Sequence, residues 1–215
     1  TMQIAQTLYE GVNLGGKYGT IGLITYMRTD SLRIAADAIG EAQALIRAEY
    51  GDNYAHARQY KSKKSAQDAH EAIRPTSVFI KPNDIKDKLS NDQYKLYKLI
   101  WERFVASQME SATYNVSSAQ MSAGTHSFRA SGSEIAFNGY MSVYIESSDE
   151  KEEKSKLLPK LEEKDVLTLT KSESKQHFTQ PPARYTEPTL IKALDENGIG
   201  RPSTYAPILT NILQR

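Results

Sequence analysis

The chain has 215 residues and a formal net charge of +1, from 27 Lys and Arg against 26 Asp and Glu. This balance excludes a polybasic nucleic-acid-binding protein, so any surface for nucleic acid has to be local. Cysteine does not occur in the sequence, which excludes disulfides and thiolate metal sites, zinc modules included. No apolar run approaches the about 18 to 20 residues that span a bilayer, and no signal peptide is visible. We therefore expect a cytoplasmic protein without membrane contact.

The first fifty residues predict helices separated by a loop and a strand. Residues 2–10 have the amphipathic spacing of a helix already under way, so we expect the chain to be an excised piece of a longer protein. Five glycines in residues 11–22 predict a flexible loop or hinge. Residues 23–26 then predict a strand, and residues 33–49 predict a helix that stops near Gly51.

The middle of the chain changes from helical to strand-like patterns. Apolar spacing predicts a helix over residues 91–109, capped by Ser90 or Asn91. From residue 113 to 145, apolar and polar residues alternate between glycines, as they do in antiparallel strands. The charged run that follows predicts an exposed loop, and residues 165–178 predict one more strand.

The C-terminal part returns to a helical pattern. One helix is expected to end at Gly198, and Pro202 is placed to begin the next. Ser203 and Thr204 then fall in the first turn, where hydroxyls and free backbone N–H groups can hold an anion; simple N-capping is the alternative. Pro207 lies deep for such a helix and predicts an irregular start.

The order of these patterns predicts an α+β chain in three pieces. They are a mainly helical domain over residues 1–110, a strand-rich segment over residues 111–176 and a helical end over residues 177–215. No internal repeat is present, so the pieces are expected to differ in structure.

The stretch "IGLITYMRTDS" places Tyr26 at the end of the predicted strand and Arg28 two residues later. Residues i and i+2 of an extended chain point to the same side, so these side chains can face one target while Met27 points away. A phenol must lose its proton to attack phosphorus, and a nearby guanidinium favours that loss and holds phosphate oxygens. The pair is a candidate nucleophile with its phosphate-binding cation; a packed tyrosine beside a surface arginine is the alternative.

The stretch "QDAHEAIRPT" over residues 67–76 adds His70 as a second candidate. One helical turn would bring His70 and Arg74 to the same face, and Pro75 predicts that Arg74 lies at the helix end with its side chain splayed outward. His70 can donate a hydrogen bond to a phosphate or relay a proton, although a lone histidine is more often structural. The residues of a preceding basic cluster that would attract a phosphate backbone are Arg58, Lys61, Lys63 and Lys64.

Three motifs together resemble those of the type IA DNA topoisomerases: "GLITYMRTDS", "AHEAIRP" and "FTQPPARYTEPTLIKALDENGIGRPSTYA". They occur in the family's order, and the resemblance is to the bacterial topoisomerase I branch, because Met27 stands where topoisomerase III relatives usually have proline. The resemblance extends over essentially the whole chain, with a looser match in the strand-rich middle. It implies part of a torus of four domains, with the three pieces as a tyrosine-bearing domain, an arch segment and the start of a DNA-gripping domain.

The resemblance also implies a role for each candidate residue. Tyr26 would be the nucleophile that becomes joined to a 5′ phosphate, Arg28 would position and stabilise the scissile phosphate, and His70 would contact DNA in the same cleft. The residues that would bind the DNA backbone leading into the active site are Arg201, Ser203, Thr204 and Arg215. The implied activity is ATP-independent breakage and rejoining of one DNA strand, which relaxes negatively supercoiled DNA.

Cofactors and partners follow from the same resemblance. Mg²⁺ would be held by acidic residues of an N-terminal domain outside this chain, which shows no acidic triad of that kind, and the family's cysteine-rich zinc modules are also missing. The expected partner is single-stranded or negatively supercoiled DNA, and the expected state is a monomer associated with the nucleoid. Without its catalytic partners, the chain alone is expected to be inactive.

Two other functions fit parts of the pattern. A non-catalytic single-stranded nucleic-acid-binding module would use Tyr26 only to stack on a base. A tyrosine recombinase or type IB enzyme would also use tyrosine and arginine, but those proteins place the tyrosine near the C-terminal end, after their arginine and histidine residues. A covalent adduct between Tyr26 and DNA in the full-length parent separates the topoisomerase from the binding module.

Overall fold

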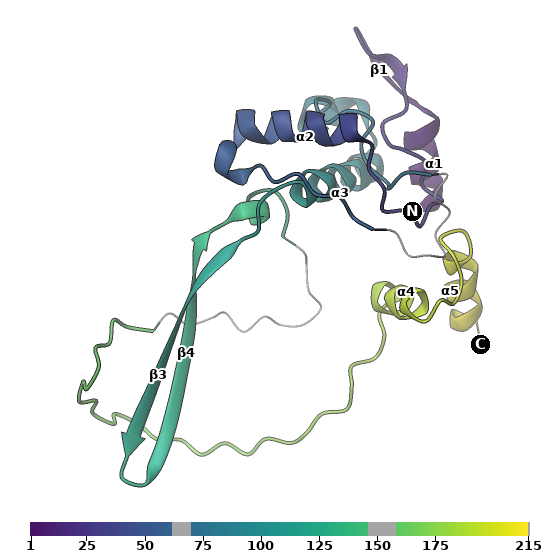
Figure 1. The fold of residues 1–215 in the computed structure, drawn as a ribbon. Helices are drawn as coiled ribbons and strands as arrows, with labels where there is room; N and C mark the ends of the chain where they lie inside the picture. The colour runs from purple at the N-terminus through teal and green to yellow at the C-terminus, as the bar shows by residue number, and fades with distance from the viewer. Residues whose placement is uncertain (62–69, 146–157, 215) are drawn as a thin grey trace. The chain divides into compact units, whose positions relative to one another are not determined.

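The computed structural model describes residues 1–61, 70–145 and 158–214 (Figure 1). It combines α-helices with two small antiparallel sheets of two strands, which confirms the predicted α+β class. Contacts divide the chain into two compact units. The first comprises residues 1–116 and 133–155, and the second comprises residues 117–132 and 156–215. The tyrosine and histidine motifs therefore belong to the first unit, and the "GRPSTY" motif belongs to the second.

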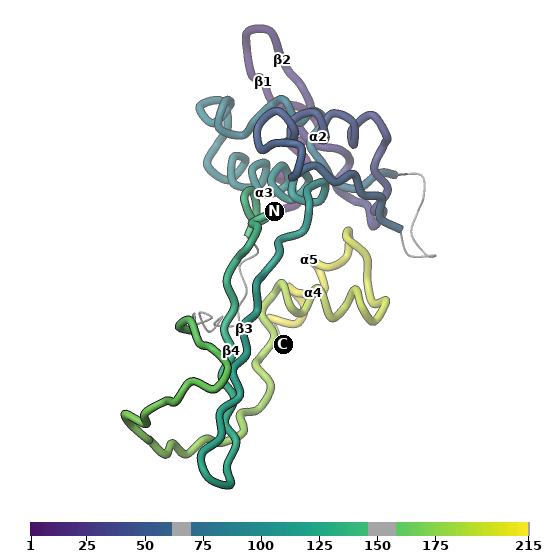
Figure 2. The backbone as a smooth tube through the Cα atoms, turned by 60° about the vertical axis from the view of Figure 1, so that its left-hand side comes forward, coloured from purple at the N-terminus to yellow at the C-terminus, as the bar shows by residue number. Residues whose placement is uncertain are grey.

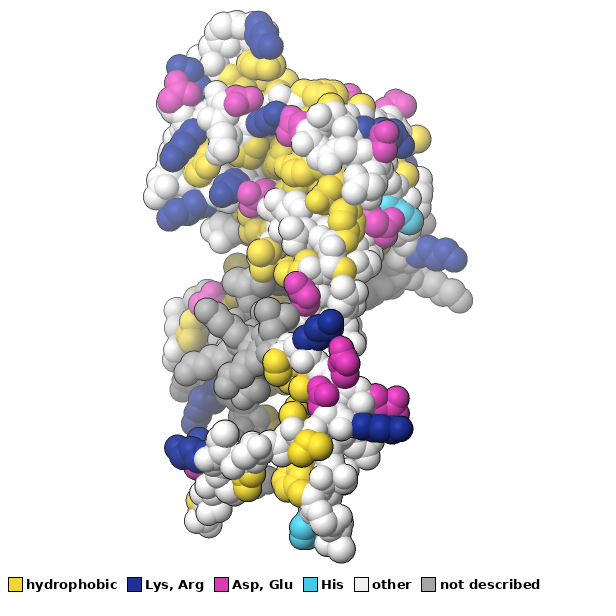
Figure 3. Space-filling model, turned by 90° about the vertical axis from the view of Figure 1, so that its left-hand side faces the viewer, with side chains coloured by type: hydrophobic (Ala, Val, Ile, Leu, Met, Phe, Trp, Pro, Cys, Tyr) yellow, Lys and Arg dark blue, Asp and Glu magenta, His cyan; other side chains and the backbone are white. Residues whose placement is uncertain are grey.

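Three predicted helices enclose the hydrophobic core of the first unit. They are α1 (Met2–Glu10), α2 (Ala36–Glu49) and α3 (Asn91–Ser107). The core side chains with no exposed surface are Leu8, Leu23, Ala42, Ile46, Tyr97, Val105 and Met109. Short 3₁₀ turns at η1 (Asp52–Tyr54) and η2 (Pro82–Lys88) connect the helices. On the face drawn in Figure 3, basic and acidic side chains are interspersed, in keeping with the balanced net charge.

Local hydrogen bonds set where two of these helices begin. At α3, the Ser90 hydroxyl accepts from the Gln93 N–H at 3.3 Å and the Gln93 side chain accepts from the Ser90 N–H at 2.8 Å, so Ser90 is the cap. The α2 helix begins three residues later than expected. Its approach is held out of helical geometry because the Ser31 hydroxyl accepts from the Arg33 N–H at 3.2 Å.

The glycine-rich stretch expected to be a flexible loop forms a β-hairpin instead, which projects from the unit (Figure 2). Strands β1 (Val12–Gly15) and β2 (Gly19–Ile21) pair antiparallel, with Val12 opposite Ile21. Its glycines adopt the positive φ values that a tight turn requires, 68° at Gly15 and 57° at Gly19. The glycines predict flexibility by their number, whereas in the structure they allow the reversal of the chain.

The prediction of a strand over residues 23–26 is wrong, because among the described residues this segment pairs through a single bridge, between Ile24 and Pro75. The Thr25 N–H donates to the Arg74 carbonyl at 2.9 Å, and the Thr76 N–H donates to the Leu23 carbonyl at 3.0 Å. Proline has no N–H and is accepted here because its nitrogen faces away from the pair. The segment is nevertheless extended, which is the property that orients Tyr26.

The predicted antiparallel strands are present over residues 113–137 as the long hairpin β3 (Thr113–Ala123) and β4 (His126–Phe137). Residues 138–145, whose alternation also predicts a strand, form none. At the base of the hairpin, the 3₁₀ turn η3 (Gly139–Ser142) meets the end of the segment that leaves α3: the Tyr140 N–H donates to the Glu110 carbonyl at 2.9 Å. Gly139 has φ 49°, and a Cβ there would lie 2.5 Å from the Glu110 carbonyl oxygen. Both the backbone angle and the space require glycine at this position.

Residues 165–178 form no strand within the described part of the chain, contrary to the alternation of their sequence. Val166 and Leu169 are 95% and 81% exposed. A strand needs a partner with which to exchange hydrogen bonds, and the described sheet of β3 and β4 has only these two strands. The pattern therefore describes a segment that has strand propensity but no pairing partner here.

The second unit ends in two helices, α4 (Glu187–Glu196) and α5 (Tyr205–Leu213). The α4 helix precedes Gly198 as expected. The α5 helix begins three residues after the predicted start at Pro202. A start at Pro202 would place Pro207 where its missing N–H is needed, whereas the observed start leaves it in the first turn, where N–H groups have no helical partner. Within the described residues, no helix is both long enough and apolar enough to cross a membrane.

Candidate functional site

Tyr26 lies half-buried in the first unit, in contact with two other rings. Its ring centroid is 5.4 Å from that of Tyr9 in an edge-to-face contact and 5.2 Å from that of His70 in a tilted contact of 34°. The phenol ring is therefore fixed on two sides by residues from α1 and from the histidine motif. The closeness of Tyr26 and His70 that the sequence predicts is confirmed.

Arg28 lies on the same side as Tyr26, as the alternation of an extended chain predicts. Met27 between them is only 3% exposed and packs into the core, whereas Arg28 is exposed. Both side chains border one pocket of about 460 Å³ against the polar face of α1. The residues that line it are Met2, Gln3, Gln6, Thr7, Tyr26 and Arg28. A phenol and a guanidinium thus share one open cavity.

Thr25 connects the histidine segment to the tyrosine. Its hydroxyl donates to the Ala72 carbonyl at 2.7 Å and accepts from the Arg74 N–H at 2.9 Å. Its own N–H also donates to the Arg74 carbonyl. These three bonds lie one residue from Tyr26 and two from His70, so they hold the two rings together.

The segment around His70 differs from its prediction. Residues 70–76 are not helical, because their backbone is bonded to Thr25 instead of to itself. Arg74 is not splayed outward: its side chain is 13% exposed and pairs with Glu71 at 2.7 Å. The Nδ1 atom of His70 is buried and finds no hydrogen-bond partner among the described residues.

Close approach of the backbone brings the tyrosine segment against α1. The Leu23 N–H donates to the Leu8 carbonyl at 2.7 Å, near the C-terminal end of the helix. A Cβ at Gly22 would lie 2.5 Å from the Tyr9 carbonyl oxygen, so only glycine fits there. Sequence reasoning missed Tyr9, Thr25 and Gly22 as parts of the site. The sequence feature that points to Gly22 and Thr25 is the run Gly-Leu-Ile-Thr-Tyr, in which a glycine and a hydroxyl residue shortly precede the candidate nucleophile.

Comparison with known proteins identifies the family. The DNA topoisomerase family matches residues 1–215, which is the full length of the chain. The chain belongs to the type IA DNA topoisomerase family. Among solved structures, full-length topoisomerase I from Thermotoga maritima is similar, with 38% sequence identity and a TM-score of 0.72. The alignment covers 99% of this chain and 34% of that one, so the chain spans about a third of the length of the Thermotoga topoisomerase.

The remaining topoisomerase motif, "GRPSTY", lies in the second unit and forms a compact turn before α5. The Thr204 hydroxyl accepts from the Arg201 N–H at 2.8 Å, and the Arg201 side chain donates to the Gly200 carbonyl at 2.8 Å. Ser203 is exposed and precedes the helix instead of lying in its first turn. Arg215, Lys63 and Lys64 lie outside the described residues.

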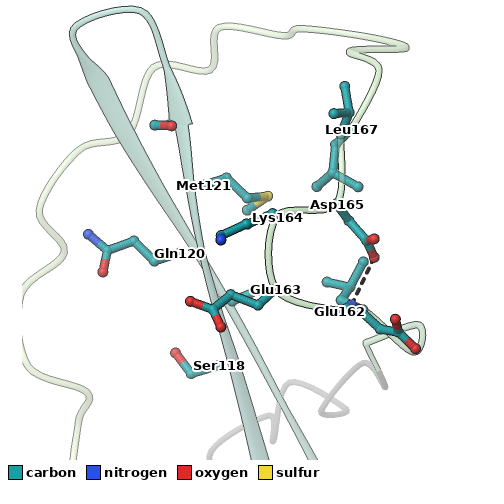
Figure 4. A pocket seen from close by; sticks show the side chains of 12 residues that line it. Ser118, Gln120, Met121, Glu162, Glu163, Lys164, Asp165 and Leu167 are labelled. Atoms are coloured by element: carbon teal, nitrogen blue, oxygen red, sulfur yellow. Dashed lines mark hydrogen bonds between the residues drawn. The ribbon is translucent and has the colours of Figure 1, made fainter.

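A second hollow, of about 660 Å³, lies in the second unit between β3 and the turn at residues 161–167 (Figure 4). The Asp165 carboxylate accepts from the Glu162 N–H at 2.8 Å and closes this turn. Glu162, Glu163 and Asp165 outnumber Lys164 among the lining residues, so the hollow has the wrong charge for a DNA phosphate. In this topoisomerase chain, the pocket beside Tyr26 is therefore the better candidate for contact with DNA.

The described residues include no group of three His, Asp or Glu side chains that could hold a metal ion. The described side chains of the first unit provide a phenol, a guanidinium and an imidazole, which are groups for binding and attacking a phosphate.

Proposed function

We propose that this chain carries the nucleophile of an enzyme that breaks and rejoins one DNA strand and so relaxes negatively supercoiled DNA. The observation that carries the proposal is the position of Tyr26, fixed between Tyr9 and His70 and open to a pocket that it shares with Arg28. Arg201, Ser203, Thr204 and Arg215 would bind the DNA backbone leading to this pocket. The same proposal assigns residues 1–110, 111–176 and 177–215 to the tyrosine-bearing domain, the arch and the DNA-gripping domain.

The proposed chemistry exchanges one phosphate ester for another. The Tyr26 oxygen forms a bond to phosphorus while the bond from phosphorus to the 3′ oxygen breaks. The phenol loses a proton to a base, and the departing 3′ oxygen takes one up. Arg28 would offset the charge that grows on the phosphate oxygens, and His70 would donate a hydrogen bond to the phosphate. Because a phosphodiester is replaced by a phosphotyrosyl ester, rejoining needs no ATP.

Several further features belong to this proposal. The groups that complete the reaction, including the acidic residues for Mg²⁺, would come from outside the chain, so the chain alone would be inactive. The enzyme would be cytoplasmic, associated with the nucleoid, and would act as a monomer on single-stranded or negatively supercoiled DNA.

The alternative of a non-catalytic binding module is less well supported by the geometry. Stacking on a base requires an aromatic face that is open to solvent. The ring of Tyr26 already contacts Tyr9 on one side and His70 on another, whereas Tyr18 on the β1–β2 hairpin is more open, with 37% of its surface exposed. A ring enclosed in this way is suited to presenting its hydroxyl group.

Relaxation of negatively supercoiled plasmid by the full-length enzyme tests the proposal. The Tyr26→Phe variant keeps both ring contacts and removes only the attacking oxygen, so we expect relaxation to disappear while the fold is retained. Tyr18→Phe removes a hydroxyl from a tyrosine that does not line the pocket, so it is the matched control and should relax the plasmid normally. Full activity of Tyr26→Phe would refute the proposed function.

A further inference from the structure

The pocket beside Tyr26 has a second wall that the reaction described above does not use. One side is formed by Tyr26 and Arg28, and the other by the exposed ridge of α1. Gln3, Gln6 and Thr7 are three and four residues apart, so they lie on one helical face, opposite the buried Ala5 and Leu8. We infer that this ridge is a binding subsite for the first nucleotide after the break, the one attached to Tyr26 through its 5′ phosphate.

The linkage chemistry indicates which nucleotide belongs here, an argument that rests on the proposed function. A 5′ phosphotyrosyl bond keeps the strand after the break covalently attached to Tyr26. Its first nucleotide must then lie within one nucleotide's reach of the phenol oxygen. The side chain of Tyr26 lines the pocket, and the pocket volume of about 460 Å³ falls within the range of small-molecule binding sites.

The side chains of the pocket suit a nucleotide. Arg28 is the charged side chain among the six that line it, and it would hold the phosphate end. The two glutamines present uncharged amides, which can donate to and accept from the edge of a base. A single-stranded base exposes that edge fully, so amide recognition is available without a groove.

Hydrogen bonds within α1 orient this ridge in advance. The Gln6 amide donates to the carboxylate of Glu10 one turn along the helix, which leaves its carbonyl oxygen as the acceptor. The Thr7 hydroxyl donates to the backbone carbonyl of Gln3 at 3.1 Å, which fixes the Thr7 side chain against the helix. A base with an amino group on its edge would find an oriented acceptor, so the subsite should discriminate among bases.

Cleavage of short single strands by the full-length enzyme tests this inference. Four oligonucleotides differ only in the base that follows the break, and four more differ only in the base before it. The Tyr26 adduct is quantified after denaturation. For the unaltered enzyme we expect adduct yields that differ by about fivefold or more among the bases after the break, the lower end for a well-placed base contact.

The double variant Gln3→Ala, Gln6→Ala keeps strong helix formers in α1 and should reduce that discrimination to less than about twofold. Preference for the base before the break should stay unchanged. Gln120→Ala is the matched control, because Gln120 lies in the part of β3 that belongs to the second unit. This variant should behave as the unaltered enzyme. The double variant Gln3→Glu, Gln6→Glu places carboxylates beside the phosphate and should lower adduct yield about tenfold or more with every base.

Two results would overturn the subsite, and a third would overturn more. The ridge does not recognise a base if the unaltered enzyme gives equal adduct yields with all four bases after the break. The same conclusion follows if the alanine double variant keeps the difference in yield. If the glutamate double variant gives the same adduct yields as the unaltered enzyme, the DNA strand after the break does not pass through this pocket. Absence of any adduct that depends on Tyr26 would refute the proposed function, and the subsite with it.

Discussion

At the scale of single residues, the site depends on a few polar contacts between segments far apart in the chain. Thr25 is the centre of these, because one hydroxyl satisfies both the Ala72 carbonyl and the Arg74 N–H. It touches no substrate in our account. Its effect passes through the position of His70 against Tyr26, which makes it a positioning residue.

We expect Thr25→Val to destabilise the first unit by about 1–3 kcal/mol, because it leaves two part-buried backbone groups without their partner. It should also lower the rate of adduct formation in the full-length enzyme while changing DNA affinity little. Thr25→Ser keeps the hydroxyl and is the control, expected to retain near-normal adduct formation. Chemical denaturation and single-turnover cleavage measure the two effects. Equal behaviour of the valine and serine variants would contradict the positioning role.

The orientation of Tyr26, Met27 and Arg28 was predictable from the sequence because it depends on the alternation of three consecutive residues. The contacts of Thr25 were not, because its partners lie 47 and 49 residues further along the chain. The orientation of Arg74 was not predictable for a related reason. Pro75 correctly suggested a break in helical structure, but the ion pair with Glu71 depends on a local path that Thr25 imposes.

At the scale of elements, the base of the β3–β4 hairpin is a tight junction in the first unit. There the chain leaving α3 passes against η3, and Gly139 touches the backbone of residues 110–112. The helices and the β3–β4 hairpin were predictable from the sequence, because the periodicity of their residues is local. The prediction failed at the β1–β2 hairpin and at residues 165–178, where the outcome depends on turn geometry and on a pairing partner.

Gly139→Ala should destabilise the first unit by more than about 2 kcal/mol, since its Cβ would meet three backbone atoms within 2.7 Å at a positive φ. The control is Gly124→Ala at the tip of the same hairpin. The φ of Gly124 is also positive, at 61°, but a Cβ there meets nothing within 4 Å. This variant should therefore lose only about 1 kcal/mol in free energy of unfolding. Thermal unfolding of the two variants compares them directly. Equal losses would show that the close contact at the base does not matter.

At the scale of the whole molecule, the chain spans about a third of the length of its Thermotoga relative. In the proposed function it holds one side of the active site. We expect the 215-residue chain alone to form no detectable adduct with single-stranded DNA and Mg²⁺. Each missing catalytic group typically lowers the rate about a hundredfold or more, and in the proposed function several such groups come from outside the chain. A denaturation-resistant adduct formed by the chain alone, and lost in Tyr26→Phe, would show that its own residues suffice.

The central claim is that Tyr26 becomes covalently joined to a 5′ phosphate of DNA. The full-length enzyme is trapped on a single-stranded oligonucleotide with denaturant, digested with a protease and analysed by mass spectrometry. We expect one modified peptide, containing Tyr26 and carrying the nucleotides that follow the break, and we expect it to be absent in Tyr26→Phe. A nucleotide on any other residue, or on Tyr26 through a 3′ phosphate, would contradict this claim.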